Sequence, residues 1–242
     1  MAMYEMKREI TYSQVGKDLK VDMAELAHFF QDAVLVQSEL IGRGVEETKR
    51  SKTAWFLSSW QIEVMRYPAF MEHITVRTWP YEFKSMYGYR NFDVIDQDGQ
   101  TIARANSIWI FMDLEKMRPT KPTTEQVKGY EIEPPLEMEY APRKIQILED
   151  EYRLSEKEQS PILVKPSFLD SNEHVNNGRY VTEAMDYLPT DIEWKQMRVD
   201  YRKAATLGDS MYPIQYQNDN VFQVVFADES GTPYVIVEGV SE

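Results

Sequence analysis

The 242-residue sequence contains no cysteine. A disulfide framework, a thiolate metal site and a cysteine nucleophile are therefore excluded. Basic residues are also scarce, with 27 Lys and Arg against 40 Asp and Glu, for a net charge of −13. Nucleic-acid binding needs a clustered positive field, so this balance argues against a nucleic-acid partner while leaving a local basic patch open.

Long apolar runs are missing as well. The longest, at 108–112 and 234–237, have strand length, and none approaches the roughly 18 apolar residues of a membrane-spanning helix. The N-terminal residues lack the apolar core of an export signal. We therefore expect a cytoplasmic protein without membrane insertion. A hydrophobic share of 43%, with 10 Gly and 12 Pro, is typical of a folded globular chain.

The first half of the sequence shows one helix followed by strands. Apolar residues over 23–41 follow helical spacing, and Asp22 with Glu25 resembles the start of a capping box. Asp98-Gly99 indicates a hairpin turn. Four strands are predicted after the helix, at 54–65, 73–83, 87–95 and 101–113.

The second half repeats this order. A helix is expected to begin at Asn176 or Asn177 and to end before Pro189. Strands are predicted after it at 196–203, 210–217, 221–227 and 233–239. Similar residues in the two halves lie 137 positions apart in the strands and 151 apart in the helices. The repeated order predicts an α+β fold made of two copies of one unit.

Proline marks the boundary between the copies, because five of the 12 prolines fall within 119–142. We therefore place an N-terminal unit at 1–118, a Pro-rich connector at 119–142 and a C-terminal unit at 143–242. A short helical turn is expected at 124–128 inside the connector.

Residues 168–180 carry the most informative side chains, Phe-Leu-Asp-Ser-Asn-Glu-His-Val-Asn-Asn-Gly-Arg-Tyr. Asp170, Asn172 and His174 alternate, so in an extended segment all three would lie on one face. The second helix begins next to them and has unpaired backbone N–H groups in its first turn. Such a set suits attack of water on an acyl group, but caps and turns use the same residue types, which leaves a structural role equally open.

The sequence resembles the acyl-acyl carrier protein thioesterases of plants and bacteria. The resemblance rests on Asp-x-Asn-x-His-Val-Asn-Asn at 170–177 followed by Tyr180, and is supported by segments 60–68, 78–79 and 105–113 in the family's order. It implies two tandem hotdog units, each a long helix wrapped by a curved antiparallel sheet, with the active site in the C-terminal unit. It also implies hydrolysis of a fatty acyl thioester on acyl carrier protein, without metal or organic cofactor.

Carried over by position, Asp170 would activate water, while Asn172 and His174 would position it or polarise the thioester carbonyl. One departure is marked. The family has a Tyr-Arg-Arg-Glu-Cys-like segment whose Glu is a proposed second catalytic carboxylate, whereas residues 201–205 read Tyr-Arg-Lys-Ala-Ala, with Ala204 in place of the Glu. Either Asp170 with His174 suffices, another carboxylate substitutes, or activity is weak or altered. The candidate substitutes are Glu173, Glu183 and Asp200.

Acyl carrier protein is acidic, so a chain of charge −13 must concentrate cations where the carrier docks. Substrate and carrier binding is predicted at Asn176, Arg198, Arg202 and Lys203, with further cations at 143, 144 and 165. Two alternatives remain: an acyl-CoA thioesterase on the same scaffold, and a non-catalytic acyl-binding hotdog protein, which Ala204 motivates. A homodimer is also left open.

Overall fold

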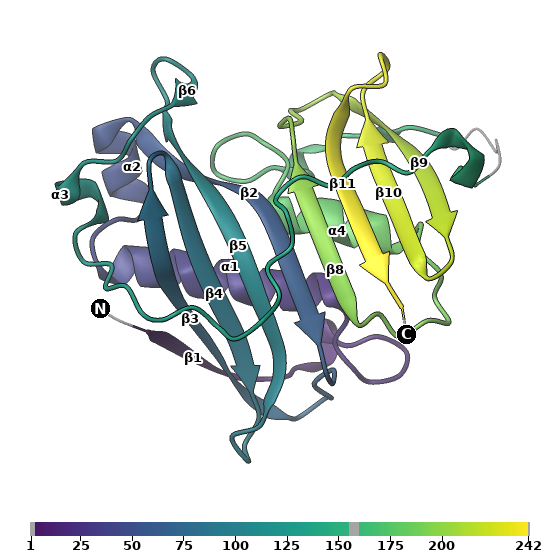
Figure 1. Cartoon of the computed structure of the whole chain (residues 1–242), viewed down its shortest axis with the longest axis horizontal. Coiled ribbons are helices and arrows are strands. Elements are labelled where there is room, and N and C mark those ends of the chain that lie inside the picture. Colours follow the sequence, from purple (N-terminus) through teal and green to yellow (C-terminus); the bar gives the residue numbers. More distant parts are fainter. Residues whose placement is uncertain (1–2, 155–159, 242) are drawn as a thin grey trace. The chain divides into compact units, whose positions relative to one another are not determined.

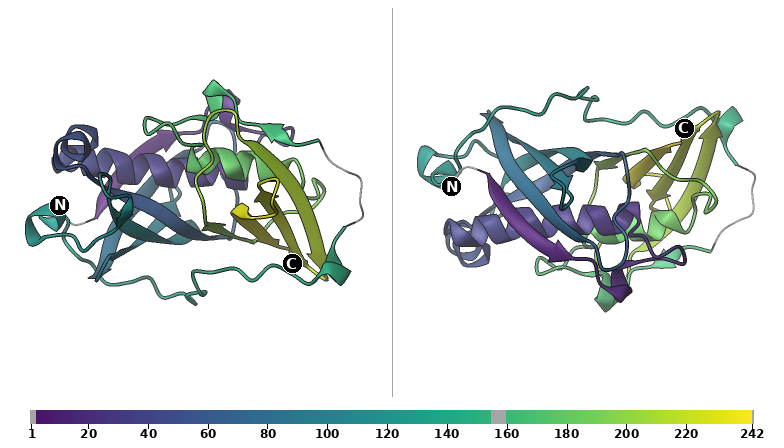
Figure 2. Two further views of the ribbon diagram at one scale, coloured as in Figure 1. Left: turned by 90° about the horizontal axis from the view of Figure 1, so that it is seen from above. Right: turned by 90° about the horizontal axis from the view of Figure 1, so that it is seen from below.

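A computed structural model describes residues 3–154 and 160–241 (Figure 1). The chain divides into two compact units, Met1–Ala141 and Pro142–Glu242. In each unit an antiparallel sheet carries a helix on one of its faces, as the views from above and below in Figure 2 show. The class predicted from the sequence, α+β with one repeated unit, therefore matches the arrangement of elements.

The first unit is built on helix α1, Met23–Leu40. The Asp22 carboxylate caps it by accepting a hydrogen bond from the Glu25 N–H at 2.8 Å. Gly42, with φ 71°, lies just beyond its end, where left-handed backbone favours glycine. The buried face of α1 is apolar apart from Gln37 and consists of Met23, Ala24, Leu26, Ala27, Phe29, Phe30, Ala33, Val34 and Gln37.

Five strands form the main sheet of this unit in the order β1-β3-β4-β5-β2, with antiparallel neighbours. They are β1 Tyr4–Glu9, β2 Thr53–Val64, β3 His73–Lys84, β4 Tyr87–Ile95 and β5 Thr101–Asp113. The predicted bounds of the last four are correct to within one residue. Phe30 of α1 packs against Trp60 and Phe92 of the sheet, with ring centroids 5.9 and 5.2 Å away, so the core lies between helix and sheet.

Three short elements complete the first unit. Helix α2, Val45–Ser51, has no buried residue and was not predicted, because it has no apolar periodicity. Strand β6, Arg118–Pro119, pairs with the end of β5. Helix α3, Thr124–Val127, confirms the helical turn expected in the connector, where Thr123 and Gln126 form a capping box.

The second unit has helix α4, Asn177–Met185, and a sheet ordered β8-β11-β10-β9-β7. The strands are β7 Ile162–Leu163, β8 Gln196–Tyr201, β9 Ser210–Asn218, β10 Val221–Ala227 and β11 Pro233–Val240. Helix α4 has half as many residues as α1 and is therefore shorter than the long helix expected in each unit. After Met185 the backbone hydrogen bonds join residues three apart, from Tyr187 N–H to the Ala184 carbonyl oxygen and from Leu188 N–H to that of Met185, so the α-helical pattern stops there. No helix within the described ranges is long and apolar enough to cross a membrane.

Extended chain at 133–148, here called the strap, lies on the sheet face opposite the helix in each unit. Alternating strand side chains reach it: Phe92 faces α1, so Asn91 faces the strap and accepts a hydrogen bond from Leu136 N–H. Further side chains that bond the strap backbone are Gln61, Trp79 and Arg104 in the first unit and Arg198, Asp200, Arg202 and Gln223 in the second. These bonds explain polar residues such as Asn91 that are fully buried in mid-strand.

One turn occurs in both units with the same backbone hydrogen bonds. In the turns 16–20 and 170–174, the first N–H bonds the fifth carbonyl oxygen at 2.8 Å. The fourth residue of each has left-handed backbone, with φ 59° and 61°. Each turn is followed three residues later by the first residue of a helix, α1 or α4. Local structure is therefore duplicated down to individual bonds.

These bonds also fix the register of the repeat. Val21 N–H bonds the Pro68 carbonyl oxygen, and Val175 N–H bonds that of Ala205, which confirms the offset of 137 for the strands. The helices begin 154 residues apart, at Met23 and Asn177, so the predicted offset of 151 is wrong. Three residues are close to one helical turn, and an apolar pattern looks similar after such a slip.

Candidate active site

The segment with Asp170, Asn172 and His174 is a tight turn and not the extended segment that the alternation predicted. Asp170 N–H bonds the His174 carbonyl oxygen at 2.8 Å, and Glu173 has φ 61°. Asp170 Oδ1 accepts hydrogen bonds from Asn172 N–H at 2.7 Å and His174 N–H at 3.4 Å. Asp and Asn favour such turns because their side chains bond nearby N–H groups. The turn therefore brings the three predicted residues together.

Asn176 connects this turn to α4. Its side-chain oxygen accepts a hydrogen bond from Gly178 N–H at 2.9 Å, and its own N–H bonds the Phe168 carbonyl oxygen at 2.9 Å. The predicted start of the helix is confirmed, with Asn176 as its cap. The Arg179 guanidinium lies 4.1 Å above the centroid of the Phe168 ring and pairs with Glu183 at 2.6 Å. The side-chain oxygen of Asn176 thus caps α4, and the substrate-binding role of this residue stays a prediction.

Ala204, which replaces the expected Glu, adjoins the turn. Val175 N–H bonds the Ala205 carbonyl oxygen at 2.9 Å, and Ala205 N–H bonds the Tyr180 hydroxyl oxygen at 2.9 Å. Ala205 is fully buried, whereas Ala204 is exposed. Ala205, the neighbour of Ala204, bonds Val175 directly after the turn and Tyr180 of α4. With alanine instead of glutamate at position 204, the border of the candidate site therefore has no carboxylate at this position.

Two tyrosines next to the turn, the buried Tyr180 and the half-buried Tyr201, were missed as site residues. Tyr201 donates from its hydroxyl to the Asn177 carbonyl oxygen at 2.9 Å, and its ring meets that of Tyr180 edge-on at 6.1 Å. Burial raises the pKa of both phenols, so both stay protonated at neutral pH. Tyr180 belongs to the motif, and the position of Tyr201 on the inward-facing side of β8 is the sequence signal that indicates its place beside α4.

Of the three carboxylates considered as substitutes for the missing Glu, Asp200 is excluded by the strand geometry. Tyr201 faces α4, so Asp200, the preceding residue of β8, faces the strap. There its Oδ2 accepts hydrogen bonds from Ile145 N–H at 3.2 Å and Arg202 Nε at 2.9 Å. It is almost completely buried on the sheet face opposite α4.

The other carboxylates differ in how much they are engaged. Glu183 is paired with Arg179, and Glu173 is exposed on the turn itself. A further one, Asp209, lies outside the sequence motif; its Oδ2 accepts hydrogen bonds from Thr206 N–H at 2.8 Å and Thr206 Oγ1 at 3.1 Å. Of Glu173, Glu183 and Asp200, Glu173 is thus the one that pairs with no cation among the described residues.

The cations predicted to bind the carrier have partners within the second unit. Arg198 and Arg202 donate to carbonyl oxygens of the strap at 2.7 and 2.5 Å, and each also pairs with a carboxylate of its own sheet. Lys203 pairs with Asp228 at 2.8 Å. Their docking role stays a prediction, but the strap gives the two arginines a structural role that the sequence did not reveal.

No group of three or more His, Asp or Glu side chains in the described residues is arranged to hold a metal ion. The two histidines other than His174 lie in the first unit, where His28 is 3.5 Å from Glu25 and His73 is 3.8 Å from Glu9. The candidate site is therefore described by its carboxylate, amide, imidazole and helix N-terminus.

Solved structures share the fold of the whole chain. An acyl-ACP thioesterase from Bacteroides thetaiotaomicron matches with a TM-score of 0.86 at 21% identity, over 99% of this chain and 98% of that one. The 12:0-ACP thioesterase from Umbellularia californica matches with a TM-score of 0.85 at 19% identity, over 99% and 97%. The predicted double hotdog fold is confirmed.

Curated relatives are plant enzymes. The chain is 27% identical over 207 residues to the chloroplastic palmitoyl-acyl carrier protein thioesterase of Arabidopsis thaliana, which covers 78% of this chain and 49% of that protein. It is 26% identical over 227 residues to oleoyl-acyl carrier protein thioesterase 2 of the same plant, covering 85% and 60%. The chain thus spans about half to three fifths of the length of these relatives.

Family models match both units. The acyl-ACP thioesterase N-terminal domain matches residues 1–130, and the acyl-ACP thioesterase C-terminal domain matches residues 151–236, which include the turn 170–174 and α4. Together with the shared fold, these matches give the assignment that the motif suggested: the chain belongs to the acyl-ACP thioesterase family.

Proposed function

We propose that this protein hydrolyses fatty acyl thioesters of acyl carrier protein to free fatty acid and holo-carrier, with the active site in the C-terminal unit. The observation that carries the proposal is the match of both units to the two domains of one thioesterase family, with the turn 170–174 inside the second match. The relatives' names support the substrate class, since they act on palmitoyl and oleoyl chains of acyl carrier protein.

Asp170 is the proposed general base. Two N–H groups hold its Oδ1, and its Oδ2 has no hydrogen bond within the described residues. A carboxylate fixed through one oxygen leaves the other to take a proton from water. The resulting hydroxide oxygen attacks the thioester carbonyl carbon, the C–S bond breaks, and the proton passes to the carrier thiolate.

The charge that develops on the carbonyl oxygen needs hydrogen-bond donors. The Asn172 amide and the His174 imidazole belong to the turn of Asp170, and the N–H of Asn177 opens helix α4 three residues after that turn. Donors fixed before the reaction stabilise an oxyanion without reorganisation. Asn172 and His174 are therefore assigned to carbonyl polarisation and water positioning.

Replacement of Asp170 tests the mechanism. Asp170→Asn keeps an oxygen for the Asn172 and His174 N–H groups but removes the base, so kcat should fall by about 10²- to 10⁴-fold while the melting temperature changes little. Asp191→Asn, at an exposed aspartate outside the turn, is the matched control and should leave kcat unchanged. A near-normal rate in Asp170→Asn would remove this residue from the mechanism.

A non-catalytic acyl-binding protein is the alternative that one observation favours, namely the exposed Ala204 beside the turn. It predicts tight acyl binding without hydrolysis above background, and Ala204→Glu would then create turnover. Turnover of acyl-CoA and acyl-carrier substrates with the same acyl chain is compared, and faster turnover of the acyl-CoA substrate would indicate an acyl-CoA thioesterase. Light scattering of the purified protein distinguishes a monomer from a homodimer.

A further inference from the structure

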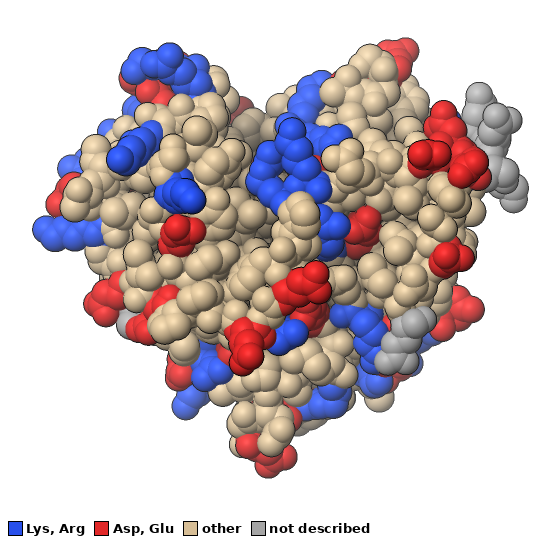
Figure 3. Space-filling model, in the orientation of Figure 1, with Lys and Arg blue, Asp and Glu red and all other residues tan. Residues whose placement is uncertain are grey.

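Cationic side chains gather at one end of the first unit, where α2 leads into β2 and where β6 pairs with β5. We call this surface the basic end and define it by Lys49, Arg50, Lys52, Lys84, Lys116, Arg118 and Lys121. All seven are exposed. Figure 3 shows blue side chains over this end of the unit, with a few red ones among them and further blue groups elsewhere on the same face.

Strand pairing places these residues together although they are far apart in the sequence. Arg118 pairs with Asp113 in the β6–β5 ladder, and Asp113 pairs with Thr53, the first residue of β2. Leu114 N–H bonds the Lys52 carbonyl oxygen at 2.9 Å. Residues 86 and 120 both bond the backbone of Phe111, which brings the ends of β3 and β6 to the same region.

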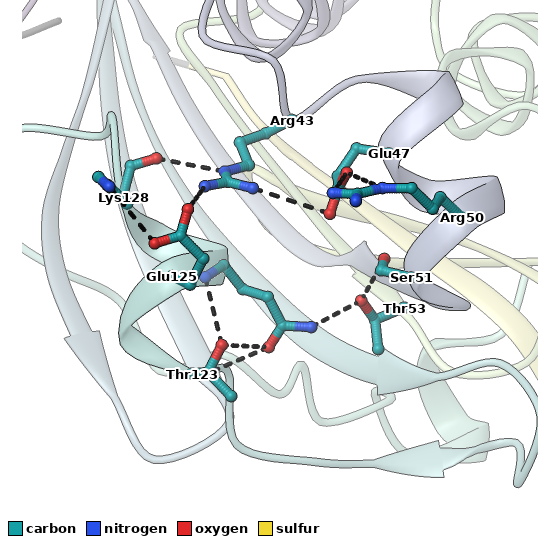
Figure 4. Close-up of polar contacts among 9 residues, drawn as sticks. Arg43, Glu47, Arg50, Ser51, Thr53, Thr123, Glu125 and Lys128 are labelled. Carbon is teal, nitrogen blue, oxygen red and sulfur yellow. Dashed lines mark hydrogen bonds and ion pairs between the residues drawn. The ribbon is translucent and has the colours of Figure 1, made fainter.

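The carboxylates in this region are largely engaged by cations of the unit itself. Figure 4 shows Arg43, a mostly buried side chain, between Glu47 and Glu125, with Arg43–Glu125 at 3.1 Å. Arg50 also pairs with Glu47, at 2.5 Å, and Lys128 also pairs with Glu125, at 3.5 Å. This network ties α2 to α3 and neutralises two acidic groups.

Four cations of the basic end are left without a carboxylate partner among the described residues: Lys52, Lys84, Arg118 and Lys121. Segments 43–52, 82–84 and 113–128 together carry nine basic side chains against six acidic ones, in a chain whose net charge is −13. The basic end is thus a region of cation excess on an otherwise acidic protein.

An exposed apolar side chain lies within this region. Met117 is 60% exposed and sits between Lys116 and Arg118, with left-handed backbone at φ 48°. The flexible thioether of Met adapts to a partner surface, and protein interfaces combine such an apolar contact with a charged rim. Cations around an exposed Met fit an acidic protein surface better than a small anion.

We propose that the basic end docks the acidic carrier domain that presents the acyl thioester. The inference rests on the proposed function, because it names where that substrate's protein part binds. An acidic partner is repelled by most of a chain of charge −13, so productive encounters are directed to the end with cation excess. This proposal places carrier docking at the basic end and not at Arg198, Arg202 and Lys203, whose charges are paired within the second unit.

The test compares two double variants of equal charge change. Arg118→Glu with Lys121→Glu reverses the basic end, and Lys7→Glu with Lys17→Glu reverses two exposed lysines elsewhere on the first unit. Initial rates are measured with an acyl-carrier substrate and with the matched neutral acyl-N-acetylcysteamine thioester. We expect KM for the acyl-carrier substrate to rise about tenfold in the first variant only, with kcat and the small thioester unaffected, and the rise to shrink with added salt.

Equal changes of KM in the two variants, or no change in either, would overturn the docking site. If the wild-type protein hydrolyses neither substrate, the proposed function fails, and calorimetric titration with holo-carrier then tests docking alone. The basic end requires that Arg118→Glu with Lys121→Glu weaken this binding while the control variant does not. Equal dissociation constants for the two variants contradict it.

Discussion

The turns 16–20 and 170–174 share backbone hydrogen bonds and left-handed fourth residues, but their side chains differ completely. The first reads Gly-Lys-Asp-Leu-Lys, and the second reads Asp-Ser-Asn-Glu-His. The backbone of this turn therefore belongs to the repeated fold and is no sign of catalysis in itself. What distinguishes the candidate active site is a carboxylate, an amide and an imidazole placed on a turn that the fold makes twice.

The chain beside each turn differs as well. Val21 in the first unit lies against Pro68, and Val175 in the second lies against Ala205. The first unit has Tyr67 where the second has Ala204, at the same offset of 137. One copy therefore has a buried aromatic ring at this position, and the other has an exposed methyl group.

The largest effect is expected from exchanging the first residue of the turns. Asp170→Gly gives the second turn the glycine of the first and should lower kcat by about 10²- to 10⁴-fold, since the proposed base is lost. Gly16→Asp gives the first turn the carboxylate and should leave kcat unchanged. A Cβ at Gly16 would meet Asp18 Oδ1 at 3.5 Å and the Lys20 carbonyl oxygen at 3.9 Å, so it fits. A large rate loss in Gly16→Asp would mean that both turns contribute to activity.

The cores of the two units give the next comparison. Phe92 is fully buried and packs against Phe30 and Trp60, so Phe92→Ala should lower the free energy of unfolding of the first unit by about 3–5 kcal/mol. In the second unit, Ile236→Val removes one buried methyl group and should cost only about 1 kcal/mol. Urea denaturation followed by tryptophan fluorescence measures both. Similar losses would show that the aromatic cluster is not what stabilises the first unit.

The side-chain caps of α1 and α4 allow a further comparison of the two units, with smaller expected losses of stability. Asp22→Ala and Asn176→Ala each remove one side-chain cap and should each cost about 1 kcal/mol of stability. Only Asn176→Ala should also lower kcat, because its helix begins next to the proposed base. Paired melting curves and rate measurements separate the two effects. If Asp22→Ala lowered kcat as much, the assignment of the active site to the second unit would be wrong.

The smallest effect concerns Glu72 of the first unit. Its hydrogen bond with Arg66 is the main cause that lowers its pKa below 4.5, with Ala69 N–H contributing. A carboxylate with a lowered pKa stabilises the fold above its unfolded pKa and loses this contribution as the pH falls through the folded pKa. Arg66→Gln should therefore cost at most about 1 kcal/mol at pH 7 and less at pH 3. An equal cost in urea titrations at both pH values would contradict this linkage.

The sequence predicted strands and first-unit helix well, because β2 to β5 and α1 have long, regular apolar patterns. It failed at the turn 170–174. The alternation of polar residues there is the same in a strand and in a turn closed by the Asp170 side chain, and only backbone bonds distinguish them. The sequence identified the residues that the turn brings together, because a carboxylate, an amide and an imidazole stand close to one another in the chain. It did not predict the turn conformation that places them.

Hydrogen bonds between the strap and β8 were the other feature that the sequence did not predict. Asp200 was considered as a replacement carboxylate, but only the strap shows that its side of β8 is covered by residues 142–148. Arg198 and Arg202 looked like surface cations for the same reason. Hydrogen bonds between residues more than 50 positions apart leave no local pattern in a sequence.

The strap also determines where the protein can be divided for separate expression. Residues 133–141 bond only side chains and backbone of the first unit in the strap contacts described above, and residues 142–148 bond only those of the second. Cleavage between Ala141 and Pro142 would preserve all of these bonds, whereas cleavage after residue 118 would strip Gln61 and Asn91 of their partners and leave their amides to water. The strap is thus part of the folded structure of each unit, and each unit needs its own part of the strap.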